Sequence, residues 1–99
     1  MRVIEFPIPM IKLNEDRVAF SIETPPGVQI EKILQTGTHH GEAYLYALVQ
    51  EGPGSSRAEF ILIATGAEFE CRILEGGYGY VSTLLINGGQ KSFHLFLKV

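Results

Sequence analysis

Short segments of this chain alternate between apolar and polar residues, and turn residues separate them. In segment 17–23 (RVAFSIE), Val18, Phe20 and Ile22 occupy every second position. A period of two is typical of a β-strand with one face in the core. Strong β signals recur about every 8 to 12 residues, which is the spacing of all-β sandwiches and barrels.

The pattern predicts about eight strands. We expect them near 2–6, 17–23, 28–36, 42–50, 58–66, 68–74, 80–86 and 92–99. Pro26-Gly27 marks one turn, and Asn87-Gly88-Gly89 marks a hairpin between the last two strands. The prediction is a single all-β domain over 1–99, with mostly antiparallel strands in a small sandwich or partly open barrel and little or no helix.

Two predicted strands are apolar on both faces. They are AYLYALV (43–49) and FILIA (60–64). A thin two-layer domain should leave one face of many strands in water. Either these strands are central and covered on both sides, or their outer face meets another subunit. We expect a homo-oligomer on this argument.

Composition and charge narrow the classes of function. The chain has 99 residues, 45% hydrophobic and 19% charged, so a packed core is expected. The net charge is −3 and the eight Lys and Arg residues are scattered. Binding to long nucleic acid needs clustered cations and is therefore not expected. A small anionic ligand needs only one or two arginines and a few amides, so it is not excluded.

The sequence gives no sign of export or of a membrane span. Glu5, Pro7 and Pro9 interrupt the N-terminal segment where a signal peptide needs an apolar run. The longest apolar stretch, 60–64, is far below the roughly 20 residues that cross a bilayer. The single cysteine, Cys71, agrees with a reducing compartment. We expect a soluble, cytoplasmic protein without membrane contact.

The adjacent residues His39 and His40 raise the question of a metal site. Gly37 and Gly41 flank them and predict a turn. Zinc would need three or four ligands, and the usual metal-ligand spacings are missing. A solvated hairpin tip is the favoured explanation, with a metal site or contact with a ligand as the alternatives. We expect no metal and no cofactor.

Groups suited to catalysis are scarce. Asp16 is the only aspartate, and no Gly-x-Ser-x-Gly elbow is present. Cys71 falls on the apolar face of its predicted strand, where a thiol is usually inert. Glu68 and Glu70 share a face with Arg72 that we expect to be solvated. The sequence predicts a protein that is not an enzyme.

Two loops offer better candidates for binding a ligand. GPGSSR (52–57) places glycines, two hydroxyls and Arg57 together, which could present amides and a guanidinium to a phosphate; the alternative is an ordinary hairpin loop. In GGYGY (76–80), Tyr78 and Tyr80 share one strand face with only glycines around them. Such rings can stack on bases, or they can simply form the rim of the sheet.

The last strand supplies two further candidates. By alternation, Phe93, Leu95 and Leu97 take its core face, so His94 and Phe96 take the other. That pair could line a pocket or a subunit interface.

The order of several short motifs resembles that of a known family. The motifs are IEFPIP, PPGVQIEKIL, YLYALV, IATG, YVST and FHLF, which together span nearly the whole chain. They resemble a family of small, mostly phage-encoded proteins of unknown function, with the pattern Pro-x-Gly-Ala, Gln-Asn-Gly, Leu-Trp-Ala-Leu-Val, Thr-Gly-His, Ile-Gly-Thr and Trp-His-Val-Phe. The resemblance aligns His39-His40-Gly41 with a turn, and His94 with the family's terminal histidine.

The chain departs from that pattern at three positions. Tyr46 stands where the family prefers tryptophan, Ala67 where it often has histidine, and Ser82 where it has glycine. The missing histidine at position 67 argues against a shared metal or catalytic centre.

The resemblance implies a phage or prophage context, and two functions follow. In the first, the protein is a counter-defence protein that sequesters a small nucleotide-type immune signal in a pocket between subunits. Tyr78 and Tyr80 would stack on a base, and Arg57 or Arg72 would pair with phosphate. In the second, the protein is an accessory module that binds a host or phage protein through a sheet edge or its apolar face.

Overall fold

All named elements of this computed structural model are β-strands. The structure describes residues 1–9, 15–69, 75–86 and 91–98. The strands within these ranges are β1 (Arg2–Pro7), β2 (Arg17–Glu23), β3 (Val28–His39), β4 (Glu42–Glu51), β5 (Arg57–Ala64), β6 (Tyr78–Ile86) and β7 (Lys91–Lys98). The all-β prediction is confirmed, with seven strands in place of about eight.

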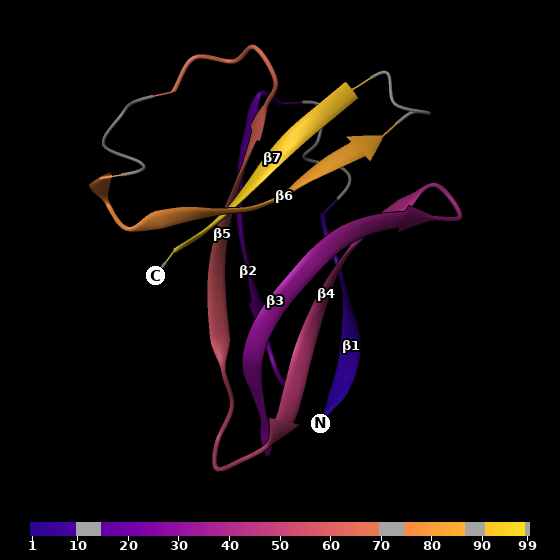
Figure 1. Cartoon of the computed structure of the whole chain (residues 1–99), viewed down its shortest axis with the longest axis vertical. Coiled ribbons are helices and arrows are strands. Elements are labelled where there is room, and N and C mark those ends of the chain that lie inside the picture. Colours follow the sequence, from indigo (N-terminus) through magenta and orange to yellow (C-terminus); the bar gives the residue numbers. More distant parts are fainter. Residues whose placement is uncertain (10–14, 70–74, 87–90, 99) are drawn as a thin grey trace.

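The strands form two antiparallel sheets (Figure 1). Sheet A has the order β1-β4-β3, and sheet B has the order β2-β5-β7-β6. The two sheets do not join into a barrel. Edge strands β3 and β6 approach each other, and their contact includes Thr36 Oγ1 at 3.1 Å from Ser82 Oγ. The protein is therefore a sandwich with one side partly closed.

The described strands do not include the one predicted over 68–74, of which only residues 68 and 69 are described. β5 ends at Ala64, where the chain turns: Gly66 has a φ of +87°, and Ala67 N donates to the carbonyl of Ala64 at 3.1 Å. Glu68 and Phe69 belong to no strand, and residues 70–74 lie outside the described residues. The turn removes the chain from sheet B two residues earlier than the apolar pattern predicts.

The first hairpin places the histidine pair at its tip. β3 runs to His39, three residues beyond its predicted end, and His39 lies opposite Glu42 of β4. His40 and Gly41 between them both have positive φ, 52° and 76°, as a tight type I′ turn requires. The predicted turn is thus confirmed.

The second hairpin joins β6 and β7. These strands pair antiparallel with Ile86 opposite Lys91. The predicted pairing of the two strands is therefore confirmed. Its turn, Asn87-Gly88-Gly89, lies outside the described residues.

The core lies between the inner faces of the two sheets. Strand β4 shows the expected period of two, because Leu45, Ala47 and Val49 are fully buried while the residues between them are partly exposed. Sheet B contributes two fully buried phenylalanines, and Phe20 stacks on one of them, Phe60, with ring centroids 5.2 Å apart. Burial of such rings supplies most of the driving force for folding.

Strand β5 explains why FILIA is apolar throughout. Phe60 and Leu62 face the core, while Ile61 and Ile63 lie on the outer face, yet both isoleucines are buried. β5 is central in sheet B, between β2 and β7. Within a single chain, β5 is therefore covered on both sides.

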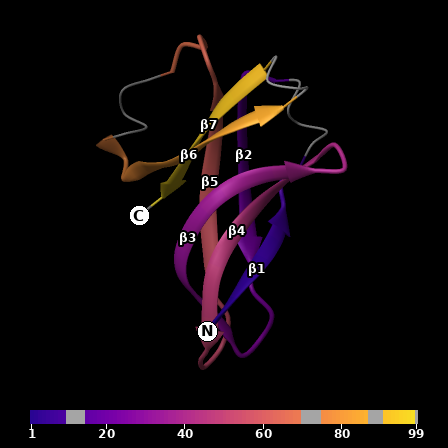
Figure 2. The ribbon, with the colours of Figure 1, turned by 45° about the vertical axis from the view of Figure 1, so that its right-hand side comes forward.

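Strand β3 bends from one sheet towards the other (Figure 2). Its pairing with β4 shifts register twice, between Ile30 and Lys32 and between Ile33 and Gln35. Such bulges bend a strand and increase its twist. The bend brings the end of β3 next to β6, and it leaves an opening between the sheets near Ile30.

Candidate functional site on the outer face of sheet B

Most of the predicted ligand-binding residues lie on one surface. In the β6–β7 register, Tyr80 lies opposite Phe96, and Thr83 lies opposite His94. Tyr78 lies opposite Lys98 in the same register. We call the surface formed by Tyr78, Tyr80, His94, Phe96 and the neighbouring Phe69 the aromatic face. It is the outer face of sheet B.

The aromatic side chains pack in T-shaped and tilted contacts and remain exposed. The rings of Tyr80 and Phe96 are 6.0 Å apart at 72°, and those of Phe69 and Phe96 are 6.2 Å apart. Even so, Tyr80 is 61% exposed and Phe69 is 39% exposed. Exposed aromatic side chains that gather on one surface are typical of interaction sites.

His94 is held by hydroxyl groups on both ring nitrogens. Its Nε2 lies 2.8 Å from Thr65 Oγ1, and its Nδ1 lies 3.2 Å from Thr83 Oγ1. Thr83 Oγ1 is also 2.8 Å from the hydroxyl of Tyr80, and Thr65 Oγ1 contacts Ser92 Oγ. This hydrogen-bonded chain fixes the plane of the imidazole beside the aromatic rings.

The same chain is poorly suited to nucleophilic catalysis. Thr65 and His94 have the hydroxyl–imidazole contact of a nucleophile and its base. The other nitrogen, however, meets the hydroxyl of Thr83, whereas a catalytic histidine is usually oriented by a carboxylate that stabilises the imidazolium. A hydroxyl orients the ring but adds no negative charge. The geometry favours a binding surface.

A row of charged residues borders the aromatic face. Glu59 Oε1 lies 3.9 Å from Arg57 Nη2, and Glu59 Oε2 lies 3.7 Å from Lys98 Nζ. Two cations share one carboxylate, so one positive charge is in excess. All three side chains are half exposed or more, and such pairs contribute little to stability. Arg57 and Lys98 can therefore exchange Glu59 for an anionic group of a partner.

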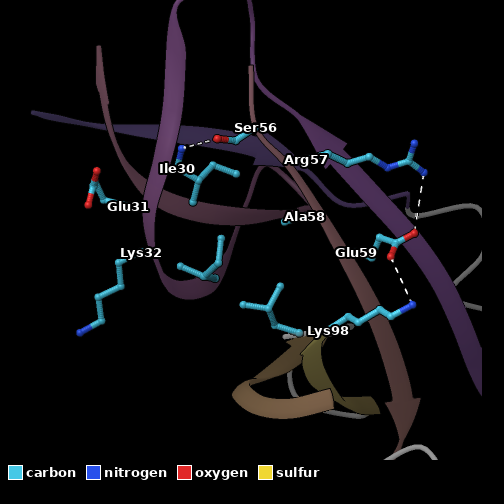
Figure 3. A pocket seen from close by; sticks show the side chains of 10 residues that line it. Ile30, Glu31, Lys32, Ser56, Arg57, Ala58, Glu59 and Lys98 are labelled. Atoms are coloured by element: carbon cyan, nitrogen blue, oxygen red, sulfur yellow. Dashed lines mark hydrogen bonds and ion pairs between the residues drawn. The ribbon is translucent and has the colours of Figure 1, made fainter. Parts of the chain in front are cut away.

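A groove of about 680 Å³ opens between the sheets next to this row (Figure 3). Apolar Ile30, Ala58 and Leu97 line it, and the charged ends of Arg57 and Lys98 turn away from Ile30. Tyr78, Tyr80, His94 and Phe96 do not line it. The groove, which Arg57 and Lys98 help to line, is thus separate from the predicted aromatic residues.

The GPGSSR loop is bound to its own chain. Ser56 N donates to Thr24 Oγ1 at 2.7 Å, and Gly52 N donates to the carbonyl of Gly27 at 3.1 Å. The Ser56 hydroxyl accepts from Ile30 N at 3.1 Å. These groups hold the loop in place and are not available to a phosphate. These contacts are those expected of an ordinary hairpin loop, and binding of a phosphate by the rest of the loop stays a prediction.

The histidine pair forms a small aromatic stack. The ring of His39 lies 4.5 Å from that of Tyr44 at 10°, and His39 Nε2 is 3.8 Å from Glu5 Oε1. Tyr44 donates to Glu42 Oε2 at 2.5 Å, and this bond raises the pKa of Tyr44 to about 12. Within the described ranges, no three His, Cys, Asp or Glu residues come together as metal ligands.

Some of the candidates lie outside the described residues. Conversely, two residues that contact His94 were not predicted from the sequence. Arg72 and Cys71 fall in 70–74, outside the described residues. Thr83 was not among the predicted site residues, although the Asn-Gly hairpin signal would have placed it across from His94. Thr65 carries no sequence signal, because only the pairing of β5 with β7 brings it to His94.

Comparison with known proteins gives a family but no activity. In the described residues, no helix is long and apolar enough to cross a membrane. No curated protein and no solved structure matches the chain. A family model described as a domain of unknown function, DUF7352, matches residues 1–99. The chain therefore belongs to the DUF7352 family.

Proposed function

We propose that this protein is a non-catalytic binding module that docks another protein on its aromatic face. The observation that carries the proposal is the exposure of Tyr80 and Phe69 around Phe96, on a surface separate from the groove beside Ile30. Small ligands prefer concave sites, whereas protein partners bind flat surfaces with aromatic anchors. This is the second of the two functions that the sequence suggested.

Tyr80 is the expected anchor of this interface. Its ring is supported edge-on by Phe96, and its hydroxyl is bound to Thr83, so few rotamers are lost on binding. Arg57 and Lys98 lie at the border, where charges steer association and set the salt dependence. The proposal includes a cytoplasmic location in a bacterial host.

A second candidate is sequestration of a small nucleotide-type signal, as part of phage counter-defence. It is favoured by the aromatic rings next to two cations that share one carboxylate. Because these rings lie on one exposed sheet face, a second subunit would have to supply the other wall of the pocket. The phage context of this candidate rests on the motif resemblance.

One experiment separates the two candidates. Wild type, Tyr80→Ala and Val3→Ala are used as baits in a lysate of phage-infected bacterial host cells. Val3 is 56% exposed on the other sheet and serves as the matched control. We expect a stoichiometric protein that Val3→Ala retains and Tyr80→Ala loses, with at least about tenfold weaker affinity for the purified pair.

The same preparations are heated, and the released small molecules are analysed by mass spectrometry. A nucleotide recovered in stoichiometric amount, without a protein, would contradict the first candidate and support the second. A protein partner that binds wild type and Tyr80→Ala equally would rule out the aromatic face.

A further inference from the structure

Strand β2 has a free edge that is unusually flat. β2 is the terminal strand of sheet B, and its seven residues pair with β5 without a register shift. It contains no proline. Natural sheet edges are normally protected by proline, bulges or very short strands, because an open edge pairs with other chains.

The other sheet edges are protected. β1 has six residues and ends at Pro7, which has no N–H to donate. β3 and β6 contain register shifts and lie against each other, with Thr36 also reaching the carbonyl of Thr83. Among the edges that the structure describes, β2 is the one suited to adding a strand.

The hydrogen-bond pattern shows which groups of β2 face outwards. Ala64 N donates to the carbonyl of Asp16 at 2.8 Å, and Thr24 N donates to that of Ser56 at 2.9 Å. Bonding alternates along an antiparallel strand, so the even-numbered residues of β2 bond to β5. The odd-numbered residues, Arg17, Ala19, Ser21 and Glu23, therefore direct their N–H and C=O groups to the free edge. No backbone bond within the described residues uses them.

We propose that two copies of this chain pair through antiparallel β2 strands, with Phe20 at the two-fold axis. In this register Ala19 lies opposite the partner's Ser21, and Arg17 lies opposite the partner's Glu23. All of these pairs belong to the outward-directed set, so the edge gains about eight hydrogen bonds. Each end of the strand pair gains one exposed ion pair between opposite charges.

The charges select this register over its neighbours. Centring the pair on Ala19 places Glu23 across from the partner's Glu15, a like charge, and Arg17 across from the partner's Ser21. Centring it on Ser21 places Arg17 across from the partner's Pro25, which has no N–H. Only the register centred on Phe20 pairs all four outward residues and both charges.

Phe20 supplies the apolar part of the contact. It is partly exposed at the inner side of the edge, and its ring is stacked on Phe60. Across the two-fold axis it meets the partner's Phe20, which buries the remaining surface of both rings. The paired sheets B then form one eight-stranded sheet that presents two aromatic faces on the same side. The proposal stands whether or not these faces bind a protein.

Sedimentation velocity over a concentration series up to millimolar tests the pairing. We expect wild type to reach twice the 11.0 kDa chain mass. Arg17→Glu and Glu23→Arg each place like charges across the axis, so each should weaken the dimer at least about tenfold. The double variant Arg17→Glu/Glu23→Arg restores opposite charges and should return close to the wild-type dissociation constant.

A backbone variant and hydrogen exchange complete the test. Ala19→Pro removes an N–H from the free edge only, so a folded monomer is expected. In wild type, the amides of Ala19 and Ser21 should become protected as concentration rises. A wild type that stays monomeric at all concentrations overturns the proposal. An oligomer whose dissociation constant is unchanged by either single charge reversal also overturns it. This second outcome can be read even if Ala19→Pro does not fold.

Discussion

At the residue scale, the clearest electrostatic feature is the bond from Tyr44 to Glu42. The carboxylate accepts a hydrogen bond from the phenol O–H and disfavours the phenolate, so the pKa of Tyr44 rises from 10.0 to about 12. His39 lies flat against the same ring. This group lies at the tip of the β3–β4 hairpin, next to the turn formed by His40 and Gly41.

The raised pKa predicts a dependence on alkaline pH. In the unfolded chain Tyr44 ionises near pH 10, and in the folded chain it ionises near pH 12. The folded state keeps the Tyr44 proton to a higher pH than the unfolded state does. The stabilisation of the fold by this group is therefore complete below pH 10 and is lost as pH rises to 12. In a phenolate absorbance titration, Tyr44→Phe should remove the last tyrosine to ionise. Glu42→Gln should move that transition to lower pH, and an unmoved transition would contradict the assignment.

At the element scale, the β3–β4 hairpin depends on two residues with positive φ. His40 has a φ of 52°, a conformation that asparagine tolerates and β-branched residues resist. We expect His40→Val to be less stable than His40→Asn by about 1 kcal/mol. Urea denaturation of the two variants checks this, and equal midpoints with equal slopes would contradict it.

Strand β5 has buried residues on both of its faces. Ile63 is on the outer face with a 2% exposed side chain, whereas Leu85 of the same face is 56% exposed. Ile63→Ala should therefore cost about 2 to 4 kcal/mol, the usual cost of a core truncation. Leu85→Ala should stay within about 0.5 kcal/mol of wild type. Denaturation in urea distinguishes them, and equal losses would show that the outer face is not covered at Ile63.

At the scale of the whole molecule, the edge strand β2 is the proposed site of self-association. A dimer through β2 links folding to protein concentration, because mass action favours the associated native state. The melting temperature of wild type should rise with concentration. That of Ala19→Pro should not, and a wild-type melting temperature independent of concentration would argue against a native dimer.

The residues that sequence reasoning selected were brought together only in part. Alternation along 92–99 predicts that His94 and Phe96 share one face of their strand, and the segment 76–80 predicts that Tyr78 and Tyr80 share one face of theirs. The β6–β7 register brings these two pairs onto the same face of sheet B. Arg57 was selected for its loop, whose amides turned out to hold the chain itself. Thr65 and Lys98 were missed because their roles arise from pairing with β7 and β5.

Local sequence determined the strands and the hairpins of this protein. The period of two in 17–23 and the turn residues His40-Gly41 act between neighbours along the chain, so these preferences are local. By contrast, the tertiary structure decided which strands share a sheet and why β5 is apolar on both faces. Those outcomes depend on packing between residues far apart in the chain, where burial of the two inner faces outweighs local propensity.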